Sequence, residues 1–372
     1  MSFFKLSILS PVSIVIFFGG LGLALNIWLY SDWSLSHTIY VIGIAFFAIF
    51  YLITKFSLSI TVGASKWRMR PSKFRVVRPS PLLIKFYWFL AILGGVGALY
   101  QIFSVGVLGQ GGLFFNLRYA HTVEKNPVPF IGHLGLFALV LSVYYVYNGA
   151  FKLSILALFL SLLVTLSAAE RTGLLLKLSA VLYVYLLVYG VKLKTVFLGA
   201  SVFLALVSVI AFSAGKSGGI GAEFFLFKYL GYGLTSFDSN VLGIYGVPCY
   251  RLVFGNVFGE ILNILADSSN YCENVPGADL GFFNVYTYLH GPYVVFGSSG
   301  VFVLMAVLGC IYSFLYHFSL SRQGVFIIFS SVFVYPLILI FYDWQFDLSA
   351  YVYVALISIP LALKLKKYNF RR

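Results

Sequence analysis

Charged residues are scarce in this chain of 372 residues, and acidic residues are the scarcest. Only 10% of the residues are charged and 11 are Asp or Glu, whereas 61% are hydrophobic and the mean hydropathy is +0.97. Soluble domains hold about 25% charged and about 45–50% apolar residues. The composition therefore excludes an ordinary soluble protein and predicts that most of the chain lies in a lipid bilayer.

Several motifs of well-known enzyme classes are also absent. The sequence contains no P-loop, which argues against the use of ATP. It has no paired histidines and no Cys-x-x-Cys, so we expect no metal ion and no other cofactor. A lipase-type Gly-x-Ser-x-Gly elbow is missing too. Any reaction of this chain must therefore take its energy from the substrate itself.

Instead, the sequence contains a series of apolar runs, each near the ~20 residues that a helix needs to cross the hydrocarbon core. Ten runs are predicted to span the membrane: 7–30, 38–62, 83–104, 129–148, 153–169, 173–190, 195–215, 294–318, 325–341 and 350–366. Residues 1–372 thus form a single transmembrane domain of an all-α, polytopic integral membrane protein. The first run is too long for a signal-peptide core and is not followed by a small-residue cleavage site, so we expect a retained helix.

Basic residues in the short loops indicate the orientation of these spans. Loop 63–82 and the C-terminal tail are rich in Lys and Arg and contain no acidic residue. With ten spans, both segments and both termini lie in the cytoplasm, and all 11 acidic residues lie on the opposite face. The net charge of +14 then reflects membrane orientation and attraction to anionic lipid, and it requires no nucleic-acid partner.

One outer segment, 216–293, is long enough to form structure of its own, and we expect it to be a large periplasmic loop. Apolar residues recur at helical spacing from Phe254 to Leu265, which predicts an amphipathic helix lying in the membrane interface. The stretch 224–246 is apolar but contains charged residues and glycines. We expect that stretch to be interfacial or re-entrant rather than spanning.

Two of the three cysteines, Cys249 and Cys272, fall in the same outer loop, while Cys310 falls inside a span. An oxidising exterior would permit a disulfide between the first two. Spacing alone cannot establish a bridge, so two free thiols are an equal alternative.

The outer face holds three arginines in three different loops: Arg118, Arg171 and Arg251. The positive-inside rule depletes this face of basic residues, and a guanidinium group fits phosphate oxygens with two parallel hydrogen bonds. We predict an anionic ligand, with pairing to nearby carboxylates or to lipid headgroups as the alternative. Arg171 is the most constrained, because a tight hairpin between two spans holds it.

Other polar residues lie near these arginines or near the eighth span. Lys177, six residues after Arg171, is an intramembrane cation that either snorkels outward or binds a ligand. His290 is a candidate base for a hydroxyl group, or an interfacial hydrogen-bonding residue; His121 in another outer loop has the same two interpretations. Tyr286 and Tyr293 either anchor the interface or stack on sugars.

Four outer segments resemble the Wzy-type O-antigen polymerases, also called oligosaccharide repeat unit polymerases. The segments are FFNLRYAH (114–121), ERTGLLL (170–176), KYLGYGLTSFD (228–238) and GFFNVYTYLHGPYVVFGSSGVFVLMAVLG (281–309). The most specific piece is Asn-Val-Tyr-Thr, beginning at Asn284, followed by Phe-Gly and a further Gly at the head of a span. The topology of the whole chain is similar to that family as well.

The resemblance implies an enzyme of the bacterial inner membrane that joins lipid-linked oligosaccharide repeat units on the periplasmic face. The growing chain leaves undecaprenyl pyrophosphate and is transferred to a hydroxyl of the next unit, and the outer arginines stabilise the departing charge. His290 is the implied base, with Glu124, Glu170 and Asp279 as alternatives. The implied substrate-binding residues are Glu170, Lys177, Glu124, Asn284, Tyr286 and Tyr293.

The implied partners are the lipid-linked repeat units, membrane lipid, and a chain-length regulator and a flippase of the same pathway. Two other functions stay open. A flippase for the same lipid-linked sugars would need charges along a path through the membrane, and the predicted spans are nearly free of charge. An O-antigen ligase-like transferase would share the leaving group and the need for arginines.

Overall fold

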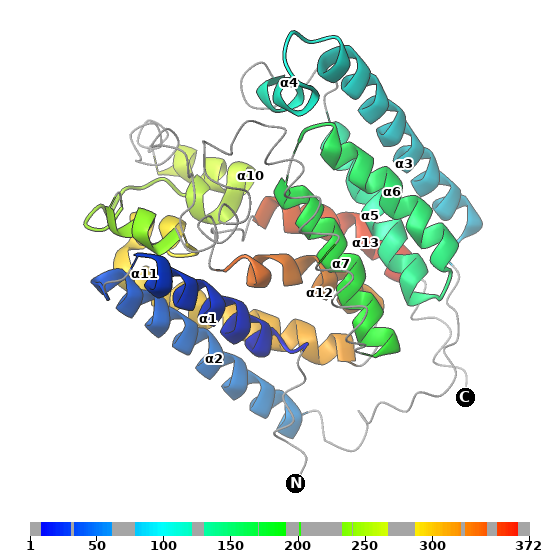
Figure 1. Cartoon of the computed structure of the whole chain (residues 1–372). Coiled ribbons are helices and arrows are strands. Elements are labelled where there is room, and N and C mark those ends of the chain that lie inside the picture. Colours follow the sequence, from blue (N-terminus) through cyan, green and yellow to red (C-terminus); the bar gives the residue numbers. More distant parts are fainter. Residues whose placement is uncertain are drawn as a thin grey trace. The chain divides into compact units, whose positions relative to one another are not determined.

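The structure is a computed structural model of the chain. It describes residues 9–30, 33–61, 79–120, 130–169, 171–190, 201, 233–239, 241–266, 287–320, 324–340 and 348–363. Every regular element within these ranges is a helix (Figure 1). The all-α prediction is confirmed for this part of the chain.

The helices follow the apolar runs of the sequence. Their bounds are α1 Pro11–Tyr30, α2 Leu35–Thr61, α3 Pro81–Gln101, the π-helix η1 Ile102–Val107, α4 Leu113–Tyr119, α5 Ile131–Tyr147, α6 Phe151–Leu166, α7 Arg171–Tyr189, α10 Arg251–Leu265, α11 His290–Leu320, α12 Gly324–Ile338 and α13 Leu348–Leu363. A further short helix, without a label, covers residues 233–239.

Nine of the ten predicted spans contain an apolar helix, and four of these helices are long and apolar enough to cross a membrane. The four are α1, α2, α3 with its continuation through η1, and α11. The other five, α5, α6, α7, α12 and α13, are shorter apolar helices. The tenth predicted span, 195–215, lies outside the described residues apart from residue 201. The number of spans and their orientation stay predictions.

Local sequence explains several helix ends. Ser80 caps α3, because its hydroxyl accepts a hydrogen bond from the amide of Leu83 at 3.2 Å, and Pro81 occupies the first helical turn, where no amide hydrogen is needed. Gly149, with φ of 77°, makes the turn between α5 and α6. Gly190, with φ of 89°, follows the last residue of α7. Glycine adopts these left-handed angles without steric cost.

The described helices fall into two compact units. Unit 1 comprises residues 1–70, 223–322 and 333–353, and unit 2 comprises residues 71–222, 323–332 and 354–372. In unit 1, α1 and α2 form an antiparallel pair, and α2 packs along α11. In unit 2, α3, α5, α6 and α7 pack against one another, with α4 attached to η1.

The pairing of α2 with α11 is parallel and close. The hydroxyl of Tyr288, just before α11, donates to the carbonyl of Tyr40 near the start of α2 at 2.6 Å. Further along both helices, the ring of Tyr312 on α11 contacts the ring of Phe47 on α2. Gly309 lets the two backbones approach, because a Cβ there would lie 3.0 Å from the amide nitrogen of Tyr51. Small residues at membrane-helix contacts commonly serve this purpose.

The antiparallel order of unit 2 is set by hydrogen bonds at opposite ends of the helices. The indole nitrogen of Trp88, near the start of α3, donates to the hydroxyl of Tyr145 near the end of α5 at 2.9 Å. At the other end, the amide nitrogen of Gln101 donates to the carbonyl of Ser167, just after α6, at 2.8 Å. The chain therefore alternates direction through α3, α5, α6 and α7.

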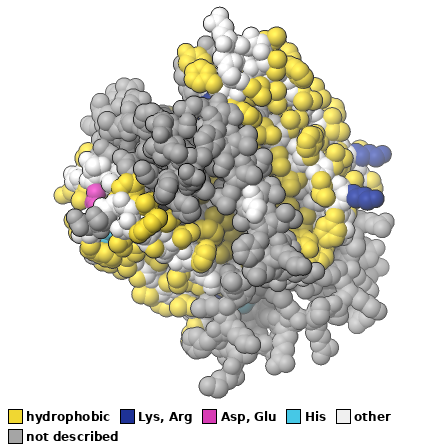
Figure 2. Space-filling view, viewed as in Figure 1, with side chains coloured by type: hydrophobic (Ala, Val, Ile, Leu, Met, Phe, Trp, Pro, Cys, Tyr) yellow, Lys and Arg dark blue, Asp and Glu magenta, His cyan; other side chains and the backbone are white. Residues whose placement is uncertain are grey.

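Large apolar side chains cover much of the outer surface of the described helices (Figure 2). Examples are Trp28, Phe56, Phe89 and Ile155, which are all more than half exposed. Such a surface is unfavourable in water at roughly 25 cal/mol per Å² of apolar area, and contiguous apolar patches mark membrane or protein interaction sites. These helices are therefore suited to a membrane environment.

Helix α10 confirms the predicted amphipathic helix, and its burial shows which face packs inward. Asn263 is fully buried and its side-chain oxygen accepts a hydrogen bond from the backbone amide of Tyr250 at 2.8 Å. Ile261, Leu262 and Leu265 are exposed. Asn263 thus packs inward together with Val253, while these apolar side chains near the end of the helix stay exposed.

Helix α11 contains a break at Gly297, where φ is 69° and ψ is −168°. This region of backbone conformation is open essentially only to glycine. The freed carbonyl of Val294 accepts a hydrogen bond from the amide of Val247 at 3.1 Å. The predicted span at 294–318 is therefore interrupted close to its beginning, at the Phe-Gly pair that carried the family resemblance.

Candidate functional site

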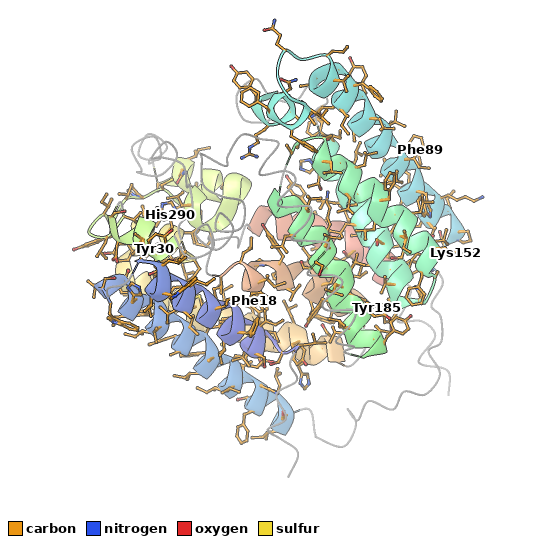
Figure 3. The ribbon with its side chains drawn as sticks, viewed as in Figure 1. Phe18, Tyr30, Phe89, Lys152, Tyr185 and His290 are labelled. Carbon is orange, nitrogen blue, oxygen red and sulfur yellow. The ribbon has the colours of Figure 1, made fainter. Side chains whose placement is uncertain are left out.

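Four segments lie close together at one end of unit 1: the end of α1, the beginning of α2, the short helix 233–239 and the beginning of α11. Tyr30 and His290 both lie at this end (Figure 3). We refer to it as the polar end of unit 1, because α1, α2, the short helix and the turn before α11 each contribute a buried polar side chain there: Asn26, His37, Ser236 and Thr287.

A chain of hydrogen bonds ties three of these elements together. His37 on α2 bonds through Nε2 to the side-chain oxygen of Asn26 on α1 at 2.8 Å, and both residues are buried. The amide nitrogen of Asn26 donates to the hydroxyl of Thr235 on the short helix at 3.0 Å. Residues 209 positions apart in the sequence are thus joined.

The hydrogen-bond partners of His37 determine its tautomer. The backbone amide of Ser34 can only donate, and it donates to Nδ1 of His37 at 3.1 Å. Nδ1 therefore carries no proton, and the ring hydrogen sits on Nε2 and is donated to Asn26. His37 is thus neutral and has both of its ring nitrogens engaged.

Asp238 lies on the same short helix as Thr235, three residues further along, and so on the same face. Its carboxylate interacts electrostatically with His37. Its Oδ1 atom is buried and has no hydrogen-bond partner among the described residues. Because buried carboxylate oxygens are normally satisfied by donors, this atom is an unusual feature of the polar end.

The beginning of α11 is held rigidly. Tyr288 is fully buried beside Tyr40, and burial, with the Tyr40 hydroxyl adding to it, raises the pKa of Tyr288 well above its usual value. Its hydroxyl therefore stays protonated and donates to α2. The backbone amide of His290 donates to the carbonyl of Thr287 at 3.1 Å. His290 is thus placed by a structured turn at the start of a helix that is long and apolar enough to cross a membrane.

Tyr293 is buried, so the structure does not present it as an open sugar-stacking surface. Its ring meets that of Phe237 on the short helix at a centroid distance of 5.1 Å, and its hydroxyl accepts a hydrogen bond from the amide of Gly243 at 3.3 Å. Tyr293 thereby fixes the short helix that carries Asp238 against the helix that begins at His290.

Cys249, two residues before Arg251, is disulfide-bonded, and Cys310 is free. Cys272, the third cysteine of the chain, lies outside the described residues. Arg251 is the first residue of α10. The bond at Cys249 therefore restrains the backbone next to one of the predicted pyrophosphate-binding arginines.

In unit 2, Arg118 lies in the last turn of α4. Asn116 holds this short helix against η1, because its side-chain nitrogen donates to the carbonyls of Gly106 and Gly111 at 3.0 and 2.9 Å, and its oxygen accepts from the amide of Gly111. Gly106 lies in η1, which continues α3. Arg118 is therefore attached to the end of α3 that also carries Gln101.

The α6–α7 hairpin confirms the predicted tight turn: α6 ends at Leu166 and α7 begins at Arg171. Ala169 in the turn has a left-handed φ of 51°. The hydroxyl of Ser167 closes the end of α6 by donating to the carbonyl of Val164 at 2.7 Å. Arg171 thus starts α7 at the same end of unit 2 as Gln101.

Lys177 is buried, and its ammonium is engaged by groups on the neighbouring helix. It is 5% exposed, and its ammonium donates to the carbonyl of Ser161 at 2.7 Å and to the hydroxyl of Thr165. Both acceptors lie on α6. The cation therefore bridges the two helices of the hairpin, one and a half turns below Arg171.

The predicted site residues are thus distributed over both units. Arg118, Arg171 and Lys177 belong to unit 2, whereas Arg251, His290 and Tyr293 belong to unit 1. The remaining predicted residues, with the alternative bases, lie outside the described residues: Glu124, Glu170, Asn284, Tyr286, His121 and Asp279.

Sequence reasoning missed His37, Asn26 and Asp238. Asp238 ends the segment KYLGYGLTSFD, which carried part of the family resemblance, so a signal for it was present. His37 and Asn26 flank the turn between the first two apolar runs, where single polar residues stand beside long apolar stretches. Nothing in the sequence indicates that they meet Thr235.

No group of three or more His, Cys, Asp or Glu among the described residues could hold a metal ion. Comparisons with protein-family models, with curated proteins and with solved structures found no match.

Proposed function

We propose that this chain is a polysaccharide polymerase of a bacterial inner membrane. It transfers a growing glycan from undecaprenyl pyrophosphate to a hydroxyl of the next lipid-linked repeat unit, on the periplasmic side. The observation that carries the proposal is the set of three arginines at helix ends, within segments that resemble the O-antigen polymerases: Arg118, Arg171 and Arg251.

The helix directions within each unit agree with the proposed topology. Ten spans with both termini inside require α2 and α11 to run in the same direction, and they are parallel. The same topology requires α3, α5, α6 and α7 to alternate, and they do. This agreement supports an odd number of spans between α2 and α11.

The positions of the basic residues in unit 2 also agree with the proposed topology. Arg118 and Arg171 lie at the end where α3 finishes and α7 begins. Lys85 is the fifth residue of α3 and Lys152 is the second residue of α6, both at the opposite end, and Lys152 is exposed and lies away from α4 (Figures 1 and 3). In the proposed topology the lysines face the cytoplasm and the arginines face the periplasm.

The chemistry requires little beyond charge and position. In the transfer, the anomeric carbon of the growing chain loses its bond to pyrophosphate, and the electron pair leaves with the pyrophosphate oxygen. Guanidinium groups that bind this oxygen stabilise the developing charge and need no metal. The hydroxyl of the acceptor unit forms the new bond and gives up its proton to a base.

Lys177 has a supporting role in this proposal. Its ammonium is engaged by α6, so it keeps the hairpin closed beneath Arg171 and adds positive potential at that end of unit 2. Electrostatic interactions act more strongly in a low-dielectric interior than in water. Arg171 is therefore ranked first among the three arginines.

The test is the length distribution of polymer made from lipid-linked repeat units, with expression level measured in parallel. Alanine at Arg171 should lower the rate by about 10²–10³-fold, as removal of a donor to a developing oxyanion does. Arg171→Lys should rescue only in part, because a lysine cannot supply the bidentate geometry. Lys152→Ala, at the opposite end of unit 2 and exposed, is the matched control and should keep normal polymer length.

A strain that lacks the chain should carry surface glycan of single repeat units. Loss of all surface glycan would indicate flipping or ligation instead of polymerisation. If alanine at each of the three arginines left polymer length unchanged at normal expression, the role of arginine in binding pyrophosphate would be refuted.

A further inference from the structure

We propose that Asp238 binds the hydroxyl of the incoming repeat unit and removes its proton. This inference rests on the proposed polymerase function and names a base that the family resemblance did not supply. It assigns a role to the only acidic side chain that the structure describes, at the polar end of unit 1.

The first support is the state of the carboxylate. Oδ1 of Asp238 is buried and has no hydrogen-bond partner among the described residues. A buried acceptor left unsatisfied costs free energy, which proteins accept mainly where a ligand or a reaction uses the group. A sugar hydroxyl is a suitable donor, because it is neutral and places one hydrogen on one oxygen.

The second support is the way in which the short helix 233–239 is held. Thr235, one turn before Asp238, is bonded to Asn26, which is bonded to His37. On another side of the same helix, the ring of Phe237 packs on Tyr293. A hydrogen bond from Asn26 on α1, which His37 on α2 holds in place, and an aromatic contact from α11 thus fix the orientation of a helix that is too short to be stable alone.

The third support is the chemistry around the carboxylate. His37 is neutral, and its proton is committed to Asn26, so it does not donate a hydrogen bond to Asp238. The lone pairs of Oδ1, which accept no hydrogen bond from the described residues, are therefore available to take a proton. Asn26 and His37 are positioning residues in this arrangement, because they act through Thr235 and the helix, and do not touch the substrate.

The acceptor hydroxyl donates its proton to Oδ1 of Asp238 while its oxygen forms a bond to the anomeric carbon of the growing chain. The bond from that carbon to the pyrophosphate oxygen breaks, and the electron pair stays with pyrophosphate. Asp238 later passes the proton to water or to the departing pyrophosphate, which restores the carboxylate.

The experiment compares Asp238→Asn and Asp238→Glu with Ser239→Ala in the full-length protein. Ser239 is the next residue, is exposed, and donates only within its own helix, so its variant is the matched control. Asp238→Asn should slow transfer by about 10²–10⁴-fold, as loss of a general base does. Its thermal midpoint should equal or exceed that of the unaltered protein, because the amide removes an unsatisfied buried charge.

Glutamate at position 238 should restore part of the rate. A structural role would give another pattern, in which Asp238→Asn lowers the thermal midpoint and reduces transfer in proportion to the folded protein. That pattern overturns the proposal. A rate for Asp238→Asn within about threefold of normal also overturns it, because loss of a general base should slow transfer by at least about 10²-fold.

A binding measurement distinguishes failure of this inference from failure of the proposed polymerase function. The probe is lipid-linked oligosaccharide extracted from a strain that lacks the chain, and the readout is the shift that it produces in the thermal midpoint. If the unaltered protein makes no polymer, the proposed function fails. In that case a shift that is lost in Asp238→Asn still supports a hydroxyl-binding role, whereas an equal shift in both proteins refutes it.

Discussion

At the scale of single residues, three buried polar side chains of the described helices form hydrogen bonds to neighbouring helices. Lys177 donates to α6, Gln101 donates to the carbonyl after α6, and His37 donates to α1. Each interaction crosses between helices that are otherwise joined mainly by apolar contacts. Such bonds give specificity to packing between surfaces that lack a hydrophobic driving force in lipid.

The bond between Lys177 and Thr165 can be tested by a double-mutant cycle. Thr165→Val removes one acceptor from a buried cation and should lower the free energy of unfolding by about 1.5–3 kcal/mol. Lys177→Met keeps the apolar stem but removes the charge, so Thr165→Val should cost much less in that background. Unfolding of the purified protein by titrating denaturing detergent into mixed micelles measures both costs.

Thr165→Ser loses the methyl group but retains the hydroxyl, so it should behave like the unaltered protein and shows that the hydroxyl is the group that matters. Equal costs of Thr165→Val with and without Lys177 would mean that the two side chains are not coupled. The sequence singled out Lys177 as an unusual residue, but only the packing of α7 on α6 identified its acceptors.

At the scale of elements, the break in α11 at Gly297 follows from a backbone conformation that other residues avoid. A Cβ at this position would meet nothing closer than 3.8 Å, so there is room for a methyl group. Any cost of Gly297→Ala therefore reports backbone strain and not a clash. We expect a loss of about 1–3 kcal/mol in the same unfolding measurement.

Gly20→Ala is the control for this substitution. Gly20 lies inside α1 with open space around it, so alanine there should be neutral or should stabilise the helix by up to about 1 kcal/mol. A Gly297→Ala protein as stable as Gly20→Ala would show that α11 can form without the break. The Phe-Gly motif in the sequence did not by itself indicate a left-handed residue.

The contact between α2 and α11 depends on Gly309 in a different way. A Cβ there would clash with the carbonyl of Phe47 and lie 3.0 Å from the amide nitrogen of Tyr51, and both are backbone atoms that cannot rotate away. Gly309→Ala should separate the two helices and cost about 1–3 kcal/mol through overpacking. The same unfolding titration, with Gly20→Ala beside it, provides the measurement, and unchanged stability would contradict the close approach.

At the scale of the whole molecule, the orientation in the membrane follows from loops that lie outside the described helices. We expect a cysteine at position 70 to be cytoplasmic and a cysteine at position 279 to be periplasmic. Arg70→Cys and Asp279→Cys are made singly in a Cys310→Ala background that keeps the native disulfide. A maleimide that cannot cross the membrane should label only the second variant in intact spheroplasts.

Labelling of both variants after permeabilisation is the control for accessibility. If the reagent labelled position 70 in sealed cells, both the predicted orientation and the periplasmic placement of the arginines would be wrong. The measurement therefore tests the topology without any assumption about the reaction.

The sequence by itself determined which segments are apolar helices, where the tight α6–α7 hairpin lies, and that α10 is amphipathic. These properties depend on residues close together in the chain: runs of apolar residues, turn residues and helical spacing. The separation of basic from acidic loops is likewise local, and it led to the predicted orientation.

The tertiary structure alone decided which polar residues meet. The link from His37 through Asn26 to Thr235 spans most of the chain, and the bonds of Lys177 and the buried oxygen of Asp238 depend on how helices pack. An apolar helix has a similar face in every direction, so its sequence does not specify its neighbours or its rotation. Those choices are made by side-chain fit and by the need to satisfy each buried polar group.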